Sequence, residues 1–204
     1  MLFDHPWHPG HWTGASSSGC GVATAAGLCY ASIGSDSGGS IRFPCAANGL
    51  TGLKPTWGRV SRHGAFELAA SLDHVGPITR SARDALFLLS TIAGHDLLDP
   101  TSQPSVCLEV PGIDDSFRGL RVGIDESWLS DGVDPVIQQA LQQIMAMIHA
   151  GGGKLLSIRM PDTRAVSQNW EAHCGVQTAV AHADTYPLHA SQYGTFIHYL
   201  SLYL

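Results

Sequence analysis

Hydrophobic positions with helical spacing mark one clear unit in the second half of the chain. After Pro135, apolar residues recur at intervals of three and four, as on one face of a helix: Val136, Ile137, Ala140, Leu141, Ile144, Met145 and Ile148. Asp134 is a suitable N-cap, and Gly151 follows the last apolar position. The apolar runs on either side, 120–124 and 154–160, have the character of strands. The order strand, helix, strand predicts a parallel, right-handed βαβ unit.

The rest of the chain gives weaker signals. Ser81 and Asp84 form a capping box in front of a helix that we expect to end near Gly94. Small residues at 22–28 predict a closely packed helix, and residues 41–48 predict a short one. We interpret three segments as loops: an extended entry loop at 4–13, a loop region at 61–80 and a crossing loop or linker at 95–118.

The composition narrows the class of protein. The chain has 204 residues, of which 44% are hydrophobic and 14% charged, so it can bury a real core. Its net charge is −6 and it has no basic patch, which argues against a nucleic-acid partner. No run of 18 apolar residues predicts a membrane span, and residues 1–4 do not open a signal peptide.

Cysteine and histidine usage points to no metal and no disulfide framework. The five cysteines are odd in number and contain no CxxC pair, so we expect free thiols in a reducing compartment, which implies a cytoplasmic protein. His5, His8 and His11 lie in a proline-containing loop that cannot align them on a helix, and no carboxylate cluster accompanies them. We therefore predict no metal and no organic cofactor.

Two serine-rich turns carry the candidate chemistry. Residues 14–19 read GASSSG, and residues 34–40 read GSDSGGS. Glycines allow the backbone to adopt positive φ, so the N–H groups of Ser37, Gly38, Gly39 and Ser40 can point into one anion-binding concavity. A serine at the end of such a concavity has its hydroxyl beside a ready oxyanion hole. Either turn alone is more typical of an ordinary loop.

The two turns together resemble the amidase signature family. The resemblance covers GASSSG at 14–19, GSDSGGSIRFP at 34–44 and GLKPTWGRVS at 52–61. It implies an α/β amidase-signature fold, with a mixed, twisted sheet covered by helices. It also implies that Ser40 is the acyl-enzyme nucleophile, that Ser16 is a bridging serine entered through a cis peptide, and that the N–H groups of residues 37–40 form the oxyanion hole. Neither turn contains a Gly-x-Ser-x-Gly elbow, and the chain has no P-loop.

Several neighbouring residues are expected to support these loops. We assign loop support to Ser17, Asp36 and Arg42. Asp36 is expected to brace its own turn through local backbone bonds, and Arg42 to anchor the loop by donating to carbonyls or to Asp36. By the resemblance, Lys54 has a structural role. His74, beside Asp73, is a weaker candidate base, because the family uses a lysine.

The function implied by the resemblance is hydrolysis of a carboxylic amide by a Ser-cisSer-Lys triad. The family's catalytic lysine lies upstream of the first serine turn, where this sequence has none, so we expect the 204 residues alone to have impaired activity. The alternatives are the glutaminase subunit of an amidotransferase and a non-catalytic, truncated homologue. The partners that this interpretation allows are a small-molecule amide and a second copy of the same chain.

The resemblance also suggests how the chain is organised. We expect residues 1–204 to be part of one larger domain. Within it, residues 1–94 would form the catalytic core with both serine turns, 95–118 the crossing loop, and 119–204 the βαβ unit and the substrate-pocket region. Individual pocket residues within 160–204 cannot be assigned from the sequence.

Overall fold

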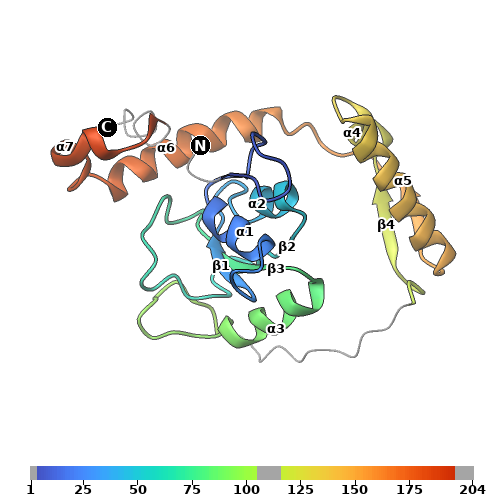
Figure 1. Ribbon diagram of the computed structural model, residues 1–204, viewed down its shortest axis with the longest axis horizontal. Coiled ribbons are helices and arrows are strands. Elements are labelled where there is room, and N and C mark those ends of the chain that lie inside the picture. The colour runs from blue at the N-terminus through green and yellow to red at the C-terminus, as the bar shows by residue number, and fades with distance from the viewer. Residues whose placement is uncertain (1–3, 105–115, 196–204) are drawn as a thin grey trace. The chain divides into compact units, whose positions relative to one another are not determined.

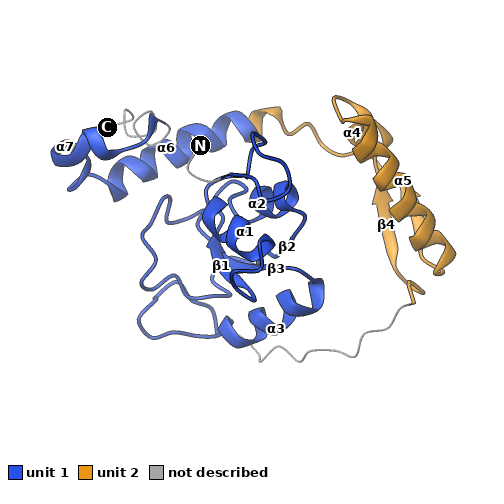
Figure 2. Cartoon of the chain, viewed as in Figure 1, with its two compact units in different colours: residues 1–110, 167–204 blue, residues 111–166 orange. Residues whose placement is uncertain are grey.

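A computed structural model describes residues 4–104 and 116–195, which fall into two compact units. Figure 2 shows the first unit (1–110 and 167–204) and the second (111–166) in different colours. Residues 119–166 belong to the second unit and residues 167–204 to the first. The helices and strands that lie wholly or mostly in the first unit are α1 (Ser18–Ala25), β1 (Ser32–Ser35), α2 (Arg42–Asn48), β2 (Thr51–Gly52), β3 (Val75–Thr79), α3 (Ala82–Ile92), α6 (Arg164–Ala181), α7 (Tyr186–His189) and the 3-10 helix η1 (Ala190–Gln192).

An antiparallel sheet lies at the centre of the first unit. Its strand order is β1-β3-β2, with Gly34 of β1 opposite Gly76 and Thr51 of β2 opposite Thr79. Helix α1 packs against α2, and α3 packs against β3 (Figure 1). Ile41, Cys45 and Ile78 form a buried apolar cluster where α2 meets the sheet. This cluster adjoins the second serine turn, because Ile41 follows that turn in the sequence.

The largest departure from the sequence prediction is β3. It lies inside the 61–80 segment that we expected to be a loop region, yet it is the central strand. Its sequence, VGPIT, carries a glycine and a proline, both of which disfavour strands. Pro77 has no N–H, but its carbonyl accepts a hydrogen bond from the Leu53 N–H at 3.0 Å. Tertiary pairing on both sides therefore outweighs the local propensity.

The small-residue helix is also displaced from its predicted position. We expected a helix over 22–28, but α1 begins at Ser18 and ends at Ala25. Gly27 has φ +73°, in the left-handed region that ends helices. The remaining local predictions for the first unit are close: α2 covers 42–48, and the Ser81 side chain accepts a hydrogen bond from the Asp84 N–H at the start of α3.

The second unit confirms the predicted βαβ order. Its elements are β4 (Arg121–Ile124), α4 (Glu126–Ser130), α5 (Pro135–Ala150) and β5 (Lys154–Ser157). β4 and β5 are parallel, Asp134 caps α5 through the Val136 N–H, and Gly151 follows its last turn. The short helix α4 was not predicted, and β5 ends at Ser157, before Met160. Asp125 caps α4 by accepting hydrogen bonds from the Ser127 and Trp128 N–H groups.

Candidate active site

The first serine turn lies against the second and is joined to it by Ser17. The Ser17 N–H donates to the Ser40 carbonyl at 3.2 Å. The Ser17 hydroxyl accepts from the Ser35 N–H at 3.2 Å and donates to the Ser35 carbonyl at 3.3 Å. The peptide bond between Ala15 and Ser16 is cis, as the family resemblance predicted. The two turns, which are separate in the sequence, thus form one structure.

Asp36 stabilises the second turn through hydrogen bonds to its carboxylate. Its side chain is fully buried and accepts hydrogen bonds from the backbone N–H groups of Gly39 at 2.8 Å, Ile41 at 3.3 Å and Arg42 at 3.4 Å. Two guanidinium nitrogens of Arg42 also donate to its carboxylate, Nε at 2.9 Å and Nη2 at 3.0 Å. Arg42 therefore reaches the carboxylate, which was one of the two contacts we considered for it.

The charge of Asp36 is stabilised by these contacts. Burial by itself raises the pKa of this carboxyl, but the hydrogen bonds and charge of Arg42, together with the backbone N–H groups of Ile41 and Arg42, outweigh burial and hold the pKa below its ordinary value. The hydrogen bond to Asp36 in turn raises the pKa of Arg42. Asp36 is thus ionised at neutral pH and acts as an acceptor for the turn.

Two glycines of the second turn have neighbours that leave no room for a side chain. Gly39 has φ +141°, and a Cβ there would lie 2.3 Å from the Phe43 ring. At Gly38 a Cβ would lie 2.4 Å from Cζ2 of Trp170. The GSDSGGS sequence therefore needs its Gly-Gly pair because aromatic rings contact it, besides the backbone freedom that we expected.

One of the four N–H groups expected in the oxyanion hole has a hydrogen-bond partner within the turn. The Gly39 N–H already donates to Asp36, and Gly39 does not line the pocket described below. Ser37, Gly38 and Ser40 do line it. The hydrogen bond from Gly39 is one of the local backbone contacts through which Asp36 was expected to brace its own turn.

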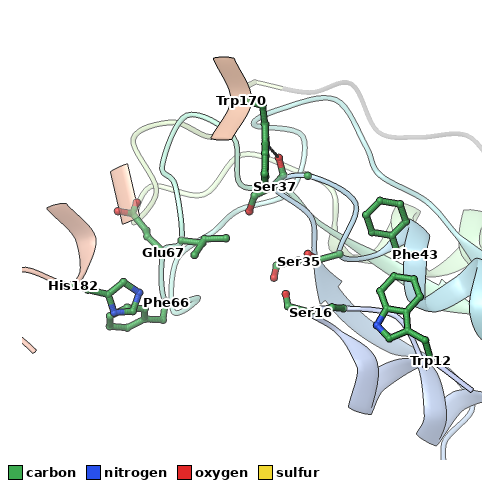
Figure 3. Close-up of a pocket in the computed structure, with 13 residues that line it drawn as sticks. Trp12, Ser16, Ser35, Ser37, Phe43, Phe66, Glu67, Trp170 and His182 are labelled. Atoms are coloured by element: carbon green, nitrogen blue, oxygen red, sulfur yellow. Dashed lines mark hydrogen bonds between the residues drawn. The ribbon is translucent and has the colours of Figure 1, made fainter. Parts of the chain in front are cut away.

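A cavity of about 420 Å³ opens onto both serine turns (Figure 3). This volume is in the range of pockets that hold small molecules. Ser16 is exposed and Ser40 is half-buried. The residues that line the cavity are Trp12, Ala15, Ser16, Ser35, Ser37, Gly38, Ser40, Phe43, Phe66, Glu67, Leu68, Trp170 and His182.

The structure supplies pocket residues that the sequence could not assign. Trp170 and His182 both belong to the carboxy-terminal stretch where individual assignments were not made. Trp170 lies 133 positions from Ser37 in the sequence, yet its indole N–H donates to the Ser37 carbonyl at 3.0 Å. No local pattern distinguishes Trp170 from other aromatic residues on amphipathic helices, so only the fold identifies it. Phe66, Glu67 and Leu68 show that part of the 61–80 segment lines the same cavity.

Lys54 and His74 form a pair that does not line the cavity. The Lys54 ammonium nitrogen lies 2.9 Å from Nδ1 and 3.0 Å from Nε2 of His74. Burial lowers the pKa of Lys54, and this effect is opposed by the charge of Asp36 and reinforced by that of Arg42. Ser37, for its part, donates its hydroxyl to Asp73. Lys54 thus contacts His74, whose backbone is hydrogen-bonded to that of Asp36.

The histidine-rich entry loop has structural contacts. His5 is buried and its Nε2 lies 2.7 Å from the Ala47 carbonyl, while its Nδ1 accepts from the N–H groups of Trp7 and His8. Among residues 4–104 and 116–195, no three His, Cys, Asp or Glu side chains gather as metal ligands. In the same ranges no helix is long and apolar enough to cross a membrane, and Cys20, Cys29, Cys45 and Cys174 are free thiols. Cys107 lies outside the described residues.

The two serine turns therefore open onto one pocket of this α/β framework. Residues 3–192 match the family model described as Amidase, so the chain belongs to the amidase family. The fold class predicted from the sequence is thereby confirmed.

Individual relatives agree with this assignment. The chain is 50% identical over 190 residues to a putative amidase, AmiD, of Mycobacterium tuberculosis, a match covering 93% of this chain and 40% of the relative. It is 43% identical over 160 residues to one component of the glutamyl-tRNA(Gln) amidotransferase of Chromohalobacter salexigens, covering 78% of this chain and 33% of that one. Among solved structures, the native peptide amidase of Stenotrophomonas maltophilia is similar with a TM-score of 0.78 and 27% identity, covering 98% of this chain and 45% of that one. The chain thus spans 40% or less of the two curated relatives that we compare.

Proposed function

We propose that this chain carries the acyl-transfer centre of an amidase, with Ser40 as the nucleophile. The observation that supports this most directly is the shared cavity, which both Ser40 and Ser16 line beside residues of the second turn. The Ser40 oxygen attacks the amide carbonyl carbon, and its proton passes to Ser16. The oxyanion accepts hydrogen bonds from N–H groups of the turn, for which we propose Ser37, Gly38 and Ser40.

The second half of the reaction follows from the same groups. When the C–N bond breaks, the relay returns the proton to the leaving amine, which leaves an ester between Ser40 and the acyl group. Water then attacks this ester and releases the carboxylic acid. A serine hydroxyl needs an activating base for the first step. By the family resemblance that base is a lysine, which Ser16 would connect to Ser40.

The source of the base is the point at which this proposal can be tested most sharply. The 204 residues contain two lysines, Lys54 and Lys154, and neither lines the cavity. We propose that the base comes from a lysine outside these 204 residues, in a segment that precedes the first serine turn in the family. The 204-residue chain alone is then expected to turn over amides slowly.

The experiment compares the chain alone with a chimera that adds the lysine-bearing amino-terminal segment of a family member. The chimera should cleave simple amides and be labelled on Ser40 by a fluorophosphonate probe, with the adduct located by mass spectrometry. Ser40→Ala should abolish both signals, and Ser16→Ala should slow turnover about 10²–10⁴-fold. Ser18→Ala is the matched control, because Ser18 belongs to the same turn but does not line the cavity.

Three results would contradict the proposal. An adduct on Ser16 would exchange the two serine roles. Undiminished turnover by Ser40→Ala would remove the nucleophile. Fast turnover by the 204-residue chain alone would mean that another group is the base, and His74 would be tested first.

The second candidate is the glutaminase component of an amidotransferase, which the 43% identical relative favours. It would use the same serines and differ in substrate, L-glutamine, and in its association with partner proteins. Co-purification of such partners would support it. If the chimera is neither labelled by the probe nor active on amides, the result would instead support a non-catalytic homologue.

A further inference from the structure

Trp170 is fixed against the second serine turn by three kinds of contact. Its indole N–H donates to the Ser37 carbonyl, and its ring occupies the space where a Cβ of Gly38 would be. It also packs against the buried pair Ala69 and Cys174. A large side chain held in this way is rigid, and Figure 3 shows its ring standing beside Ser37 at the edge of the pocket.

Aromatic rings form further walls of the same cavity. Trp12 and Phe43 lie with ring centroids 5.9 Å apart. Phe66 packs against His182 at 5.0 Å. In Figure 3 these two pairs lie on opposite sides of Ser16 and Ser35. Apolar walls around the serine hydroxyls favour an apolar group that is itself flat, because aromatic pairs gain energy beyond the area they bury.

The charged groups of the cavity do not suit an anionic substrate. Neither lysine nor arginine is among the described residues that line it. Glu67 is half exposed, and its carboxylate lies 3.6 Å from the buried guanidinium of Arg62. Burial lowers the pKa of His182, which favours its neutral form. A free amino acid such as L-glutamine has a carboxylate that would find no fixed cation among these described residues.

We propose that Trp170 is a specificity-determining residue and that this pocket selects amides with an uncharged, aromatic acyl group. The proposal rests on the function proposed above, since it names the acyl group that Ser40 would receive. Trp170 acts in two ways. Its ring face forms the wall for the acyl group, and its N–H holds the Ser37 carbonyl, which fixes the turn that binds the oxyanion.

Binding to an inactive chain separates this proposal from the chemistry. The 204-residue chain with Ser40→Ala would be titrated with phenylacetamide, acetamide and L-glutamine, and the dissociation constants measured by calorimetry or ligand-detected NMR. Phenylacetamide should bind at least about tenfold more tightly than the other two, a ratio that corresponds to about 1.4 kcal/mol. Adding Trp170→Ala should weaken phenylacetamide about tenfold and change acetamide little.

Two further variants control for loss of folding. Trp170→Phe keeps a ring against Gly38 but loses the N–H, so it should retain most of the preference for phenylacetamide. Val176 lies on the same helix, is 51% exposed and does not line the cavity, so Val176→Ala should change neither affinity. Together the two variants distinguish loss of the aromatic pocket wall from a general destabilisation of α6.

The outcomes can be told apart. If acetamide or L-glutamine binds as tightly as phenylacetamide, if no amide binds, or if Trp170→Ala weakens all three equally, the specificity proposal is wrong. If phenylacetamide binds selectively but the active chimera is never labelled on Ser40, the proposed function fails while the pocket's selectivity stands. If the chimera cleaves aliphatic and aromatic amides at equal rates, the function stands and the specificity proposal fails.

Discussion

The two compact units reach their structures in opposite ways. The first unit buries polar groups and builds its site from long-range contacts, with Asp36, Thr24 and Asn48 almost completely inaccessible to solvent. In the second unit, Gly153 is the only buried residue among the described positions 116–166. Apolar residues of α5 such as Val136 and Ile137 are 74% and 54% exposed. The second unit nevertheless has regular helices and strands.

This difference separates local from tertiary control of structure. In the second unit each boundary has a local cause, such as the Asp134 and Asp125 caps or Gly151 after α5. In the first unit the central strand is paired against its propensity, and the serine turns depend on a buried carboxylate. Changes to the first unit should therefore have large effects on both folding and the site, whereas changes to the second should be small and local.

The largest effect is expected at Asp36. Asp36→Ala removes the acceptor of three backbone N–H groups and the partner of Arg42, and should lower the free energy of unfolding by about 3 kcal/mol, because buried donors without acceptors cost about 1–3 kcal/mol each. Fluorophosphonate labelling of the chimera at Ser40 should also disappear. Chemical denaturation and mass spectrometry measure the two effects. A stable variant with normal labelling would show that the turn holds itself without this carboxylate.

A smaller loss is expected when Gly38 gains a side chain. Gly38→Ala places a Cβ 2.4 Å from the Trp170 ring, which should cost about 2 kcal/mol, a typical penalty for overpacking. Trp170→Ala in the same chain should restore part of this loss, since the two residues contact each other. Gly194→Ala is the control, because a Cβ there would meet nothing within 4 Å. Purely additive effects in the double variant would mean that the contact is unimportant.

Low pH should destabilise the first unit, because it protonates the Asp36 carboxylate. The folded pKa of Asp36 lies below its ordinary value of 3.8, so its contribution to stability is present above that pH and is lost as pH falls through the lower, folded pKa. The free energy of unfolding should therefore decline below about pH 4. In Asp36→Asn, which cannot ionise, the decline should be shallower. Equal pH dependence of the two chains would assign the effect to other groups.

The smallest effect is expected in the second unit. Asp134→Ala removes the side chain that accepts the Val136 N–H at 2.9 Å, and should destabilise α5 by about 1 kcal/mol. Hydrogen exchange of the α5 amides should become faster, while Ser40 labelling of the chimera stays unchanged. Asp131→Ala is the control, because it removes the same charge from the residue that follows α4, where the side chain caps no helix N-terminus. Altered labelling by Asp134→Ala would show that the two units are coupled.

The sequence alone determined the parts that depend on neighbours along the chain. The βαβ order, the caps at Ser81 and Asp134 and the stop at Gly151 follow from short-range hydrogen bonding and apolar spacing, which is why they could be predicted. The family was suggested by the resemblance of the two serine turns and of the block at 52–61. The resemblance also indicated Ser16 and Ser40 as the candidate catalytic serines within those turns.

Only the tertiary structure decided how the site is built. β3 became a strand because β1 and β2 pair with it on both sides, against a sequence of Gly and Pro. Trp170 reached Ser37 across 133 positions of sequence, a contact that depends on where α6 packs and on nothing in its local pattern. Hydrogen bonds between residues a few positions apart follow from the local sequence. The hydrogen-bond partner of a side chain far away in the sequence is determined by the packing of the whole unit.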